Sequence, residues 1–471
     1  MCSKTKIICT LGPASWDPEV IGQLIEAGVD AARINFSHGD RDSHLRMYRT
    51  FREVAAKLGK QLPVMGDLQG PRIRVGKIPG SGIRLEQGGR IVLSSRNEPA
   101  RDKWIGTTYK SFSKDLSPGN TVLLNDGLLR LTVEKIDGDD VHCRVEVGGR
   151  LSSHKGINLP EIPISEPPLT DKDRADLEFM IKEGFDFVAL SFVQSAGDIK
   201  QLKEILSQAG SNAQVVAKIE KPAALEKLEP ILEQADGVIV ARGDLGVELG
   251  VERVPAQQKR ILRTAAKKNV LSITATQLLE SMIHNPVPTR AEASDVANAV
   301  FDGTDALLFT GETAAGKYPV ETVATADRIV REAEASVDTW GDPALLRHDG
   351  SETFSEAICH AAVSAALDLE ASAIVVGTQS GLTALLLSKF RPSMPVVGVS
   401  DSEIAVRRMN LMRGVYPVQL PRMDSLEESV ALAREHLLKS GIGSPGDSVV
   451  MTFGAPLSGR GRTNTLRMVK L

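Results

Sequence analysis

The chain has 471 residues, 42% of them hydrophobic and 25% charged, with a net charge of −4 at pH 7. Its length exceeds one ordinary domain, its composition is that of a globular protein, and its weakly acidic balance gives no basic footprint for nucleic acid. No apolar run is long enough to span a membrane and the N-terminus lacks the apolar core of a signal peptide, so we expect a cytoplasmic protein. The scattered cysteines, Cys2, Cys9, Cys143 and Cys359, lack disulfide or metal-ligand spacing and are expected to be reduced thiols.

Short apolar runs that predict buried strands alternate with segments of helical periodicity, such as residues 17–28 and 255–268. The predicted strands lie within residues 6–13, 31–37, 63–68, 185–192, 214–220, 237–245, 271–277 and 306–312. Repeated β–α units predict a parallel sheet, and eight of them predict an α/β fold with a closed (β/α)8, or TIM, barrel. An open doubly wound sheet is the alternative.

Two further domains are predicted. Residues 71–168 show period-2 runs separated by turn residues, which indicates an inserted all-β domain, expected to be a β-barrel lid. Just after it, Thr170 and Asp173 predict a helix cap. Beyond Trp340 helices and strands alternate again. We therefore expect a barrel domain over residues 1–70 and 169–340, the lid over 71–168, and an open α/β domain over 341–471.

Polar residues at the ends of the barrel strands predict the site, because the carboxyl rim of such a barrel holds the catalytic residues. Side chains alternate along a strand, so Lys218 and Glu220 share the face of Val216. By the same argument, Arg33, Asn35 and Ser37 share one face of the second predicted strand, and the third strand ends at Asp67. Arg242 and Asp244 share a face of the sixth strand, and Thr274 and Thr276 share a face of the seventh. Purely structural salt bridges inside the barrel are the alternative.

Glu220 and Asp244 end neighbouring strands that lie roughly 5 Å apart, so they can share one cation. Two carboxylates without histidine or cysteine predict Mg²⁺ or Mn²⁺. Together with Lys218, such a site suits the developing negative charge of phosphoryl or enolate chemistry. Gly243 allows a close backbone approach, so nearby amides are expected to bind a carboxylate.

Long motifs in all three regions resemble those of pyruvate kinase. They are TKIICTLGPAS, ARINFSHG, GDLQGPRIRVG, AKIEKPAALEKLEPIL, DGVIVARGDLGVELG and the segment from TATQLLESM to TGETAAGKYPVE. The resemblance covers essentially the whole chain. It implies transfer of the phosphoryl group of phosphoenolpyruvate to ADP, giving pyruvate and ATP in the last step of glycolysis.

The resemblance also implies roles for single residues. Lys218 stabilises the transferring phosphoryl group and the enolate oxygen, Arg33 binds the phosphoryl group, and Glu220 with Asp244 ligates the divalent metal. The amides of Gly243 and Asp244 and the hydroxyl of Thr276 receive the substrate carboxylate, and Thr276 lies where water relays a proton to the enolate. The nucleotide is expected at Asn35 and His38 on the barrel and at Arg74 and Lys155 on the lid side, with Asp126 as a further candidate.

Many pyruvate kinases need a monovalent cation, and Asn35, Ser37 and Asp67 match three of its ligand positions. Leu68 and Arg72 depart from the potassium-dependent pattern, which has threonine and glutamate there. Leu68 offers no side-chain oxygen, and Arg72 is a permanent cation. We therefore expect that K⁺ is not required, unless Arg72 points to solvent and the ion still binds.

In the family, the C-terminal domain is regulatory. The turn at residues 377–383 has hydroxyls at a helix N-terminus, which suits a phosphate, and a glycine-rich loop follows later; a plain polar turn and a solvated loop are the alternative. The expected effector residues are Thr378, Ser380, Gly381, Thr383, Arg460 and Arg462. The final region lacks the tryptophan often found in members that take fructose 1,6-bisphosphate, so a sugar or nucleotide monophosphate is an equal alternative. A homotetramer is also implied.

Two other functions are considered. A magnesium-dependent carbon–carbon lyase of pyruvate or oxaloacetate would use the same metal and enolate chemistry, but would need no nucleotide lid bearing Arg74 and Lys155. A catalytically inactive sugar-phosphate sensor would not need to keep the catalytic residues that are present. Dependence on ADP and measured turnover separate these functions from the kinase.

Overall fold

The computed structural model describes residues 3–160, 162, 164–340, 353–421, 425–454 and 463–471. Its centre is a closed barrel of parallel strands in the order β1-β16-β15-β14-β13-β12-β3-β2. The strands are β1 (Lys6–Thr10), β2 (Ala31–Asn35), β3 (Val64–Asp67), β12 (Phe187–Leu190), β13 (Gln214–Ile219), β14 (Gly237–Ala241), β15 (Leu271–Ala275) and β16 (Ala306–Phe309). The predicted barrel is confirmed, and closure excludes the open doubly wound sheet.

The alternation of side chains divides the barrel into an inner and an outer core. On β13, Val216 belongs to the cluster inside the barrel, whereas Val215, Ala217 and Ile219 pack in the cluster beneath the surrounding helices. Lys218 therefore continues the inward face, as the sequence pattern predicts.

The outer layer of the barrel consists of helices. They are α1 (Pro18–Glu26), α2 (Arg41–Lys57), α4 (Asp171–Glu183), α5 (Ala196–Gln208), α6 (Pro222–Glu226), α7 (Leu228–Gln234), α8 (Arg242–Leu249), α9 (Val254–Lys267), α10 (Arg290–Phe301), α11 (Gly311–Ala314) and α12 (Pro319–Trp340). The predicted cap of α4 is present: Asp173 N donates to Thr170 Oγ1 at 3.2 Å, and Thr170 N donates to Asp173 Oδ2 at 3.0 Å.

The insertion after β3 is a β domain with one helical turn. Its sheets have the orders β11-β7-β8-β9-β5-β6 and β10-β4. Residue 75 bridges Thr107 beyond β6, and residue 74 bridges Gly156 before β11, so this short segment joins the two edges of the larger sheet. The elements are β4 (Ile83–Leu85), β5 (Arg90–Ser94), β6 (Trp104–Gly106), α3 (Phe112–Asp115), β7 (Thr121–Leu124), β8 (Leu129–Asp137), β9 (Asp140–Val147), β10 (Gly149–Leu151) and β11 (Ile157–Asn158).

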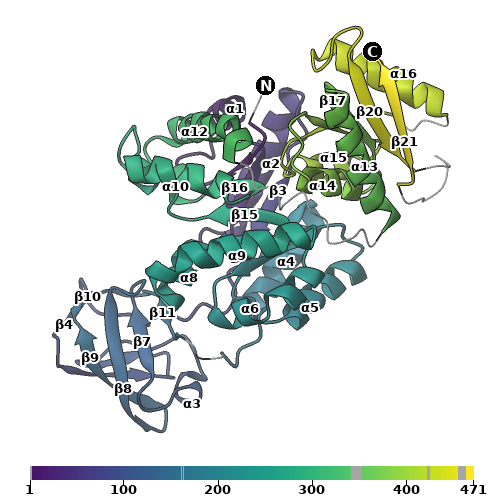
Figure 1. Ribbon diagram of the computed structural model, residues 1–471. Coiled ribbons are helices and arrows are strands. Elements are labelled where there is room, and N and C mark those ends of the chain that lie inside the picture. The colour runs from purple at the N-terminus through teal and green to yellow at the C-terminus, as the bar shows by residue number, and fades with distance from the viewer. Residues whose placement is uncertain (1–2, 161, 163, 341–352, 422–424, 455–462) are drawn as a thin grey trace.

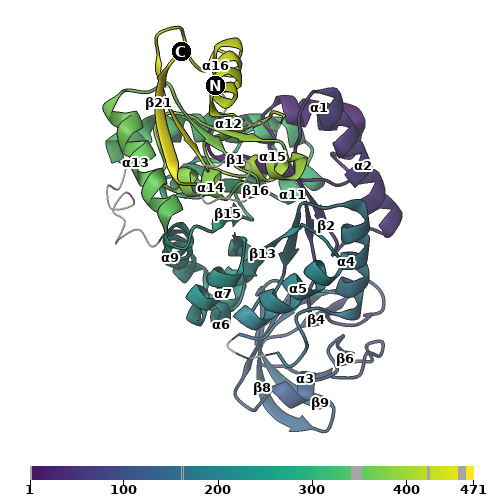
Figure 2. The ribbon, with the colours of Figure 1, turned by 90° about the vertical axis from the view of Figure 1, so that its right-hand side faces the viewer.

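The C-terminal region is an open α/β sheet in the order β19-β18-β17-β20-β21, with β21 antiparallel to β20. Its elements are α13 (Phe354–Asp368), β17 (Ala373–Gly377), α14 (Leu382–Lys389), β18 (Val396–Ser400), α15 (Glu403–Met409), β19 (Val415–Gln419), α16 (Leu426–Lys439), β20 (Ser448–Phe453) and β21 (Thr465–Lys470). Figures 1 and 2 show this domain and the β insertion at opposite ends of the barrel.

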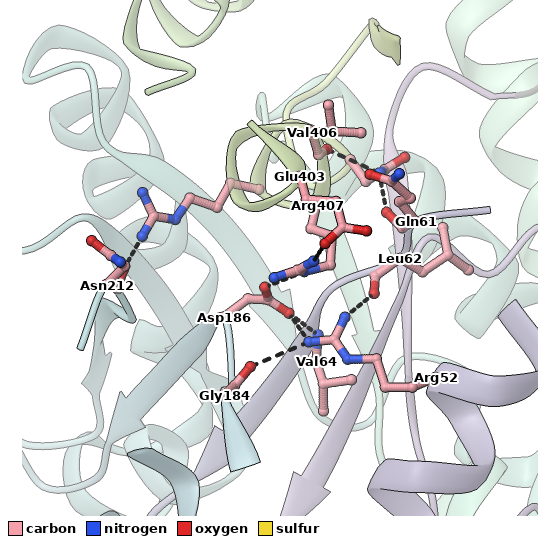
Figure 3. A network of polar contacts seen from close by, with 12 residues as sticks. Arg52, Gln61, Leu62, Val64, Gly184, Asp186, Asn212, Glu403, Val406 and Arg407 are labelled. Carbon is pink, nitrogen blue, oxygen red and sulfur yellow. Dashed lines mark hydrogen bonds and ion pairs between the residues drawn. The ribbon is translucent and has the colours of Figure 1, made fainter. Parts of the chain in front are cut away.

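The C-terminal domain is joined to the amino end of the barrel by buried contacts. Leu411 packs into the inner barrel cluster. Asp186, just before β12, accepts from Arg52 Nη2 at 2.5 Å, from Arg407 Nε at 2.7 Å and from Val64 N at 2.8 Å. Figure 3 shows this carboxylate between the two guanidinium groups, one from the barrel and one from α15. The end of a barrel opposite the site commonly serves stability.

The described cysteines are buried thiols. Cys9, Cys143 and Cys359 are free, and burial raises the pKa of each thiol to about 12; Cys2 lies outside the described residues. Within the described ranges, no helix has both the length and the apolar character needed to cross a bilayer.

Candidate active site

One pocket opens at the carboxyl end of the barrel and gathers most of the residues predicted from the strand ends. Its lining includes Arg33, Asn35, Ser37, Asp67, Arg72, Lys218, Glu220, Asp244 and Thr276, together with Gln69, Ser191, Phe192 and Thr310, which the sequence analysis did not single out. Strands β2, β3 and β13 supply Arg33, Asn35, Asp67 and Lys218 directly, because alternation aims these side chains toward the inside of the barrel.

Lys218 is the central cation of the pocket. Its Nζ lies 2.9 Å from Glu220 Oε1 and 3.3 Å from Asp67 Oδ1, and it donates to Ser191 Oγ at 2.7 Å. Burial opposes the charge, but Asp67 and Glu220 outweigh it and raise the pKa of the ammonium above its ordinary value. Lys218 therefore carries a full positive charge where little water can screen it.

Arg33 forms the second buried ion pair. Its Nη2 lies 2.6 Å from Asp67 Oδ2, its Nε donates to the same oxygen at 2.8 Å, and its Nη1 donates to Thr10 Oγ1 at 3.0 Å. Burial alone would raise the pKa of Asp67, but Lys218 and Arg33 lower it below its usual value. Asp67 is thus an ionised anchor that fixes the direction of both cations.

Glu220 and Asp244 fit a divalent cation by their chemistry. Burial raises the pKa of Glu220; Lys218 opposes that shift, and the neighbouring Asp244 adds to it. Two carboxylates that disfavour each other's charge are stabilised when a hard cation lies between them. The described residues hold no cluster of three or more histidine, cysteine, aspartate or glutamate side chains suited to a metal. The further ligands would therefore be oxygens of substrate and water.

Arg72 faces the pocket. Its Nη2 lies 3.9 Å from Asp244 Oδ1 and 3.7 Å from Asp126 Oδ1, the latter in a turn of the β insertion. The alternative in which this arginine points away into solvent does not hold, because its side chain is only 30% exposed and lines the pocket with the three expected cation-ligand residues.

The structure corrects the expected faces of the sixth and seventh strands. β14 ends at Ala241 and β15 ends at Ala275, so strand alternation does not extend to the residues that follow. Arg242 does not share a face with Asp244, which reaches the pocket from the first turn of α8. Thr274 is buried and bonded to Thr304 Oγ1 at 3.1 Å, away from the pocket.

Thr276 reaches the pocket by a different route. Its φ is 69°, and the φ of Gln277 is 51°, so the chain takes two consecutive left-handed residues directly after β15. This conformation turns the Thr276 hydroxyl toward α8, where Gly243 N donates to Oγ1 at 2.8 Å. A Cβ at position 243 would lie 3.4 Å from that oxygen, an ordinary van der Waals contact, so this contact does not by itself require glycine. The amide and the hydroxyl predicted to receive a carboxylate therefore lie together.

Three residues expected to bind the nucleotide, one on the barrel and two on the lid side, lie outside the pocket lining. Burial and the charges of Arg74, Arg72 and Arg33 lower the pKa of His38, which places His38 beside these arginines. Arg74 Nη1 donates to His154 O at 2.9 Å. Lys155 is exposed, and its carbonyl accepts from Val75 N at 2.9 Å. The fourth, Asn35, lines the pocket itself.

The predicted effector turn lies in the C-terminal domain, between β17 and α14. Gly381 N donates to Thr378 Oγ1 at 3.0 Å, and Leu382 N donates to Ser380 Oγ at 3.4 Å. Thr383 is buried, with its hydroxyl 2.7 Å from Thr463 Oγ1. Its hydroxyl therefore faces inward, while Ser380 remains exposed. Arg460 and Arg462 lie outside the described residues.

Sequence reasoning missed Ser191 and the anchoring role of Arg242. Ser191 Oγ accepts from Lys218 and donates to Leu68 O at 2.8 Å, so it orients the lysine. It follows β12 directly, and the rule that polar residues end barrel strands could have found it.

Comparisons with known proteins agree with this geometry. The model of the pyruvate kinase barrel domain matches residues 2–323, and that of the pyruvate kinase alpha/beta domain matches residues 356–469. The chain is 41% identical to a pyruvate kinase of Clostridium acetobutylicum, covering 99% of each, and 40% identical to one of Geobacillus stearothermophilus, covering 99% of this chain and 80% of that one. A crystal structure of a pyruvate kinase from Cryptosporidium parvum aligns with a TM-score of 0.93 at 33% identity, over 99% of this chain and 96% of that one.

Proposed function

Because the chain belongs to the pyruvate kinase family, we propose that the pocket at the carboxyl end of its barrel performs phosphoryl transfer between phosphoenolpyruvate and ADP with Lys218 as the central catalytic cation. The enzyme is a phosphotransferase, and its family implies a divalent metal. The observation that carries the assignment is the buried Lys218 ammonium, held by Asp67, Glu220 and Ser191 and facing the pocket.

Lys218 and Arg33 would bind the transferring phosphoryl group, since they are the buried cations of the pocket. Both are held in place before the reaction, and such preorganised charges stabilise a transition state more than a ground state. Glu220 and Asp244 would hold Mg²⁺ or Mn²⁺, which supplies Lewis-acid stabilisation of the phosphoryl oxygens. The all-oxygen donor set suits either of these hard cations.

The substrate carboxylate would lie at the first turn of α8, where the amides of Gly243 and Asp244 and the positive end of the helix favour an anion. The Thr276 hydroxyl, which accepts a hydrogen bond from Gly243 N at 2.8 Å, would then give up this bond and bind the substrate carboxylate instead. On the same side, water next to Thr276 would deliver the proton to the enolate carbon, because an alcohol alone is a weak acid.

Lys218→Met tests the assignment. It removes the charge and keeps most of the volume, so turnover should fall on the order of 10² or more while the fold survives. Lys203→Met is the matched control, because Lys203 pairs with Asp236 at 2.8 Å on the outside of the barrel. Near-normal pyruvate formation by folded Lys218→Met would contradict the mechanism. Product formation without ADP would instead indicate the lyase.

We further propose that K⁺ is not required. Arg72 places a guanidinium against Asp244 and in the same pocket as Asn35, Ser37 and Asp67. A second monovalent cation there would be repelled, and the charge it usually brings is already present.

Regulation and assembly complete the proposal. A phosphorylated metabolite would bind at the turn of Thr378 and Ser380, where two hydroxyls precede α14. The protein would form a homotetramer, as its family implies, and exposed apolar side chains such as Val251, Val287 and Phe354, which are 78%, 68% and 72% exposed, would be available for contacts between subunits. Light scattering of the purified protein tests the assembly.

A further inference from the structure

We propose that Arg242 is a positioning residue for the reaction: it holds the chain after β15 in a left-handed conformation and so fixes the Thr276 hydroxyl at the carboxylate-binding end of α8. The inference rests on the proposed role of Thr276 and deepens it. Arg242 itself is not among the residues that line the pocket.

The contacts of Arg242 are directed at the backbone of the turn. Its Nη2 donates to Thr276 O at 2.7 Å and to Gln277 O at 3.0 Å, and its Nε donates to Thr276 O at 3.2 Å. Its Nη1 donates to Asp295 Oδ1 on α10 at 2.8 Å. The side chain is only 10% exposed. One guanidinium therefore ties the start of α8, the turn after β15 and α10 together.

The turn needs such a restraint. Thr276 has a φ of 69° and Gln277 a φ of 51°. A left-handed conformation is unusual for any residue except glycine and is a clear outlier for a β-branched one. Residues held in this way persist only where surrounding contacts impose the conformation. The backbone carbonyls of these two residues accept the three hydrogen bonds that Arg242 donates.

The consequence for the site is positional. With φ in the usual negative range, the Thr276 side chain would follow strand alternation and point away from the inner face, as Thr274 does. In the left-handed conformation its Oγ1 instead lies 2.8 Å from Gly243 N, one residue after Arg242. Arg242 thus acts on both partners of this contact. It directly precedes Gly243 in the chain, and it holds Thr276 by hydrogen bonds.

The test is a double-mutant cycle on kcat/KM for phosphoenolpyruvate, with Arg242→Gln, Thr276→Ala and the double variant. Displacing a catalytic group by about 1 Å costs on the order of 10²-fold, so Arg242→Gln should lose about 10- to 100-fold. If Arg242 acts through Thr276, the double variant should be no slower than Thr276→Ala, and KM for Mg²⁺ should stay within about twofold. The rate at which the methyl group of pyruvate exchanges with solvent deuterium should fall with both single changes.

Rescue distinguishes positioning from mere stability. Gln277→Gly should restore part of the activity of Arg242→Gln, because glycine adopts positive φ freely. Arg242→Lys, which keeps one donor, covers the case in which Arg242→Gln does not fold. Arg260→Gln is the matched control, since Arg260 also donates to a backbone carbonyl, that of Leu225 at 3.1 Å, but outside the site; its activity should be unchanged.

The outcomes are separable. Normal activity of Thr276→Ala would overturn the proposed role of Thr276. A second outcome would overturn only the positioning role of Arg242. In it, Thr276→Ala is impaired, the losses of the two single variants multiply fully in the double variant, and Gln277→Gly gives no rescue.

Discussion

If potassium is not required, as proposed, reversing the charge of Arg72 should make the activity depend on potassium. Arg72 Nη2 lies 3.9 Å from Asp244 Oδ1 and 3.7 Å from Asp126 Oδ1. At such separations a unit charge pair is worth about 1 kcal/mol in water and about 4 kcal/mol near a protein surface. Because Arg72 is 30% and Asp244 27% exposed, we take about 1–2 kcal/mol. Arg72→Gln should therefore lose roughly 10-fold in kcat/KM for ADP, and Arg72→Glu roughly 100-fold.

The assay measures pyruvate formation at constant ionic strength with KCl or with tetramethylammonium chloride. Potassium should restore much of the activity of Arg72→Glu, because the new carboxylate adds an oxygen ligand beside Asn35, Ser37 and Asp67. Arg84→Glu is the control, since Arg84 pairs only with Glu86 at 2.9 Å in an exposed part of the insertion. Strong potassium stimulation of the unmodified enzyme would refute the reasoning.

Three further predictions concern the interface, the effector and pH. Asp186→Ala should lower the free energy of unfolding in urea by about 3–5 kcal/mol, because it leaves buried cations unpaired. The control Glu403→Ala removes a carboxylate that is 63% exposed and should lower it by less than about 1 kcal/mol. Equal effects of the two changes would contradict the role of Asp186 in docking the C-terminal domain. Ser380→Glu should weaken activation by phosphorylated metabolites without changing basal turnover, because it puts a negative charge on the exposed side of the turn; unchanged activation would place the effector site elsewhere. Burial lowers the pKa of both His38 and His44 below 6.5. The unfolded chain therefore binds more protons below that pH, and the stability of the folded protein should fall as the pH drops from 6.5 toward the lowered pKa values. In thermal melts, His38→Gln and His44→Gln should lose less stability over this pH range, and an unchanged pH dependence would exclude these two histidines as its source.

The barrel and most of its site could be predicted because strand alternation is a local rule. Lys218, Arg33 and Asp67 follow inward faces that the apolar residues beside them define, so their convergence needs only closure of the sheet. That closure, in turn, follows from the number of β–α units.

The prediction failed where the backbone leaves the strand. The pattern could not show that β14 ends at Ala241 or that Thr276 is left-handed, because both depend on tertiary contacts. Arg242 reads as one more strand-end charge in the sequence, and only its bonds to Thr276 and Gln277 carbonyls reveal what it does. The inward hydroxyl of Thr383 is likewise set by Thr463, 80 residues away.

The charges of the pocket have a thermodynamic consequence. Its lining includes the cations Arg33, Arg72 and Lys218 and the carboxylates Asp67, Glu220 and Asp244, so charges of both signs already compensate each other before any ligand enters. Lys218 lies 2.9 Å from Glu220 and Arg72 lies 3.9 Å from Asp244, so in the proposed mechanism they would turn to phosphate oxygens when those carboxylates receive positive charge from a metal. In that mechanism a divalent cation and the phosphorylated substrate would raise each other's affinity by the same factor, whichever binds first. A phosphate without its metal would then meet cations that are already neutralised, so the pocket would favour the metal-bearing complex.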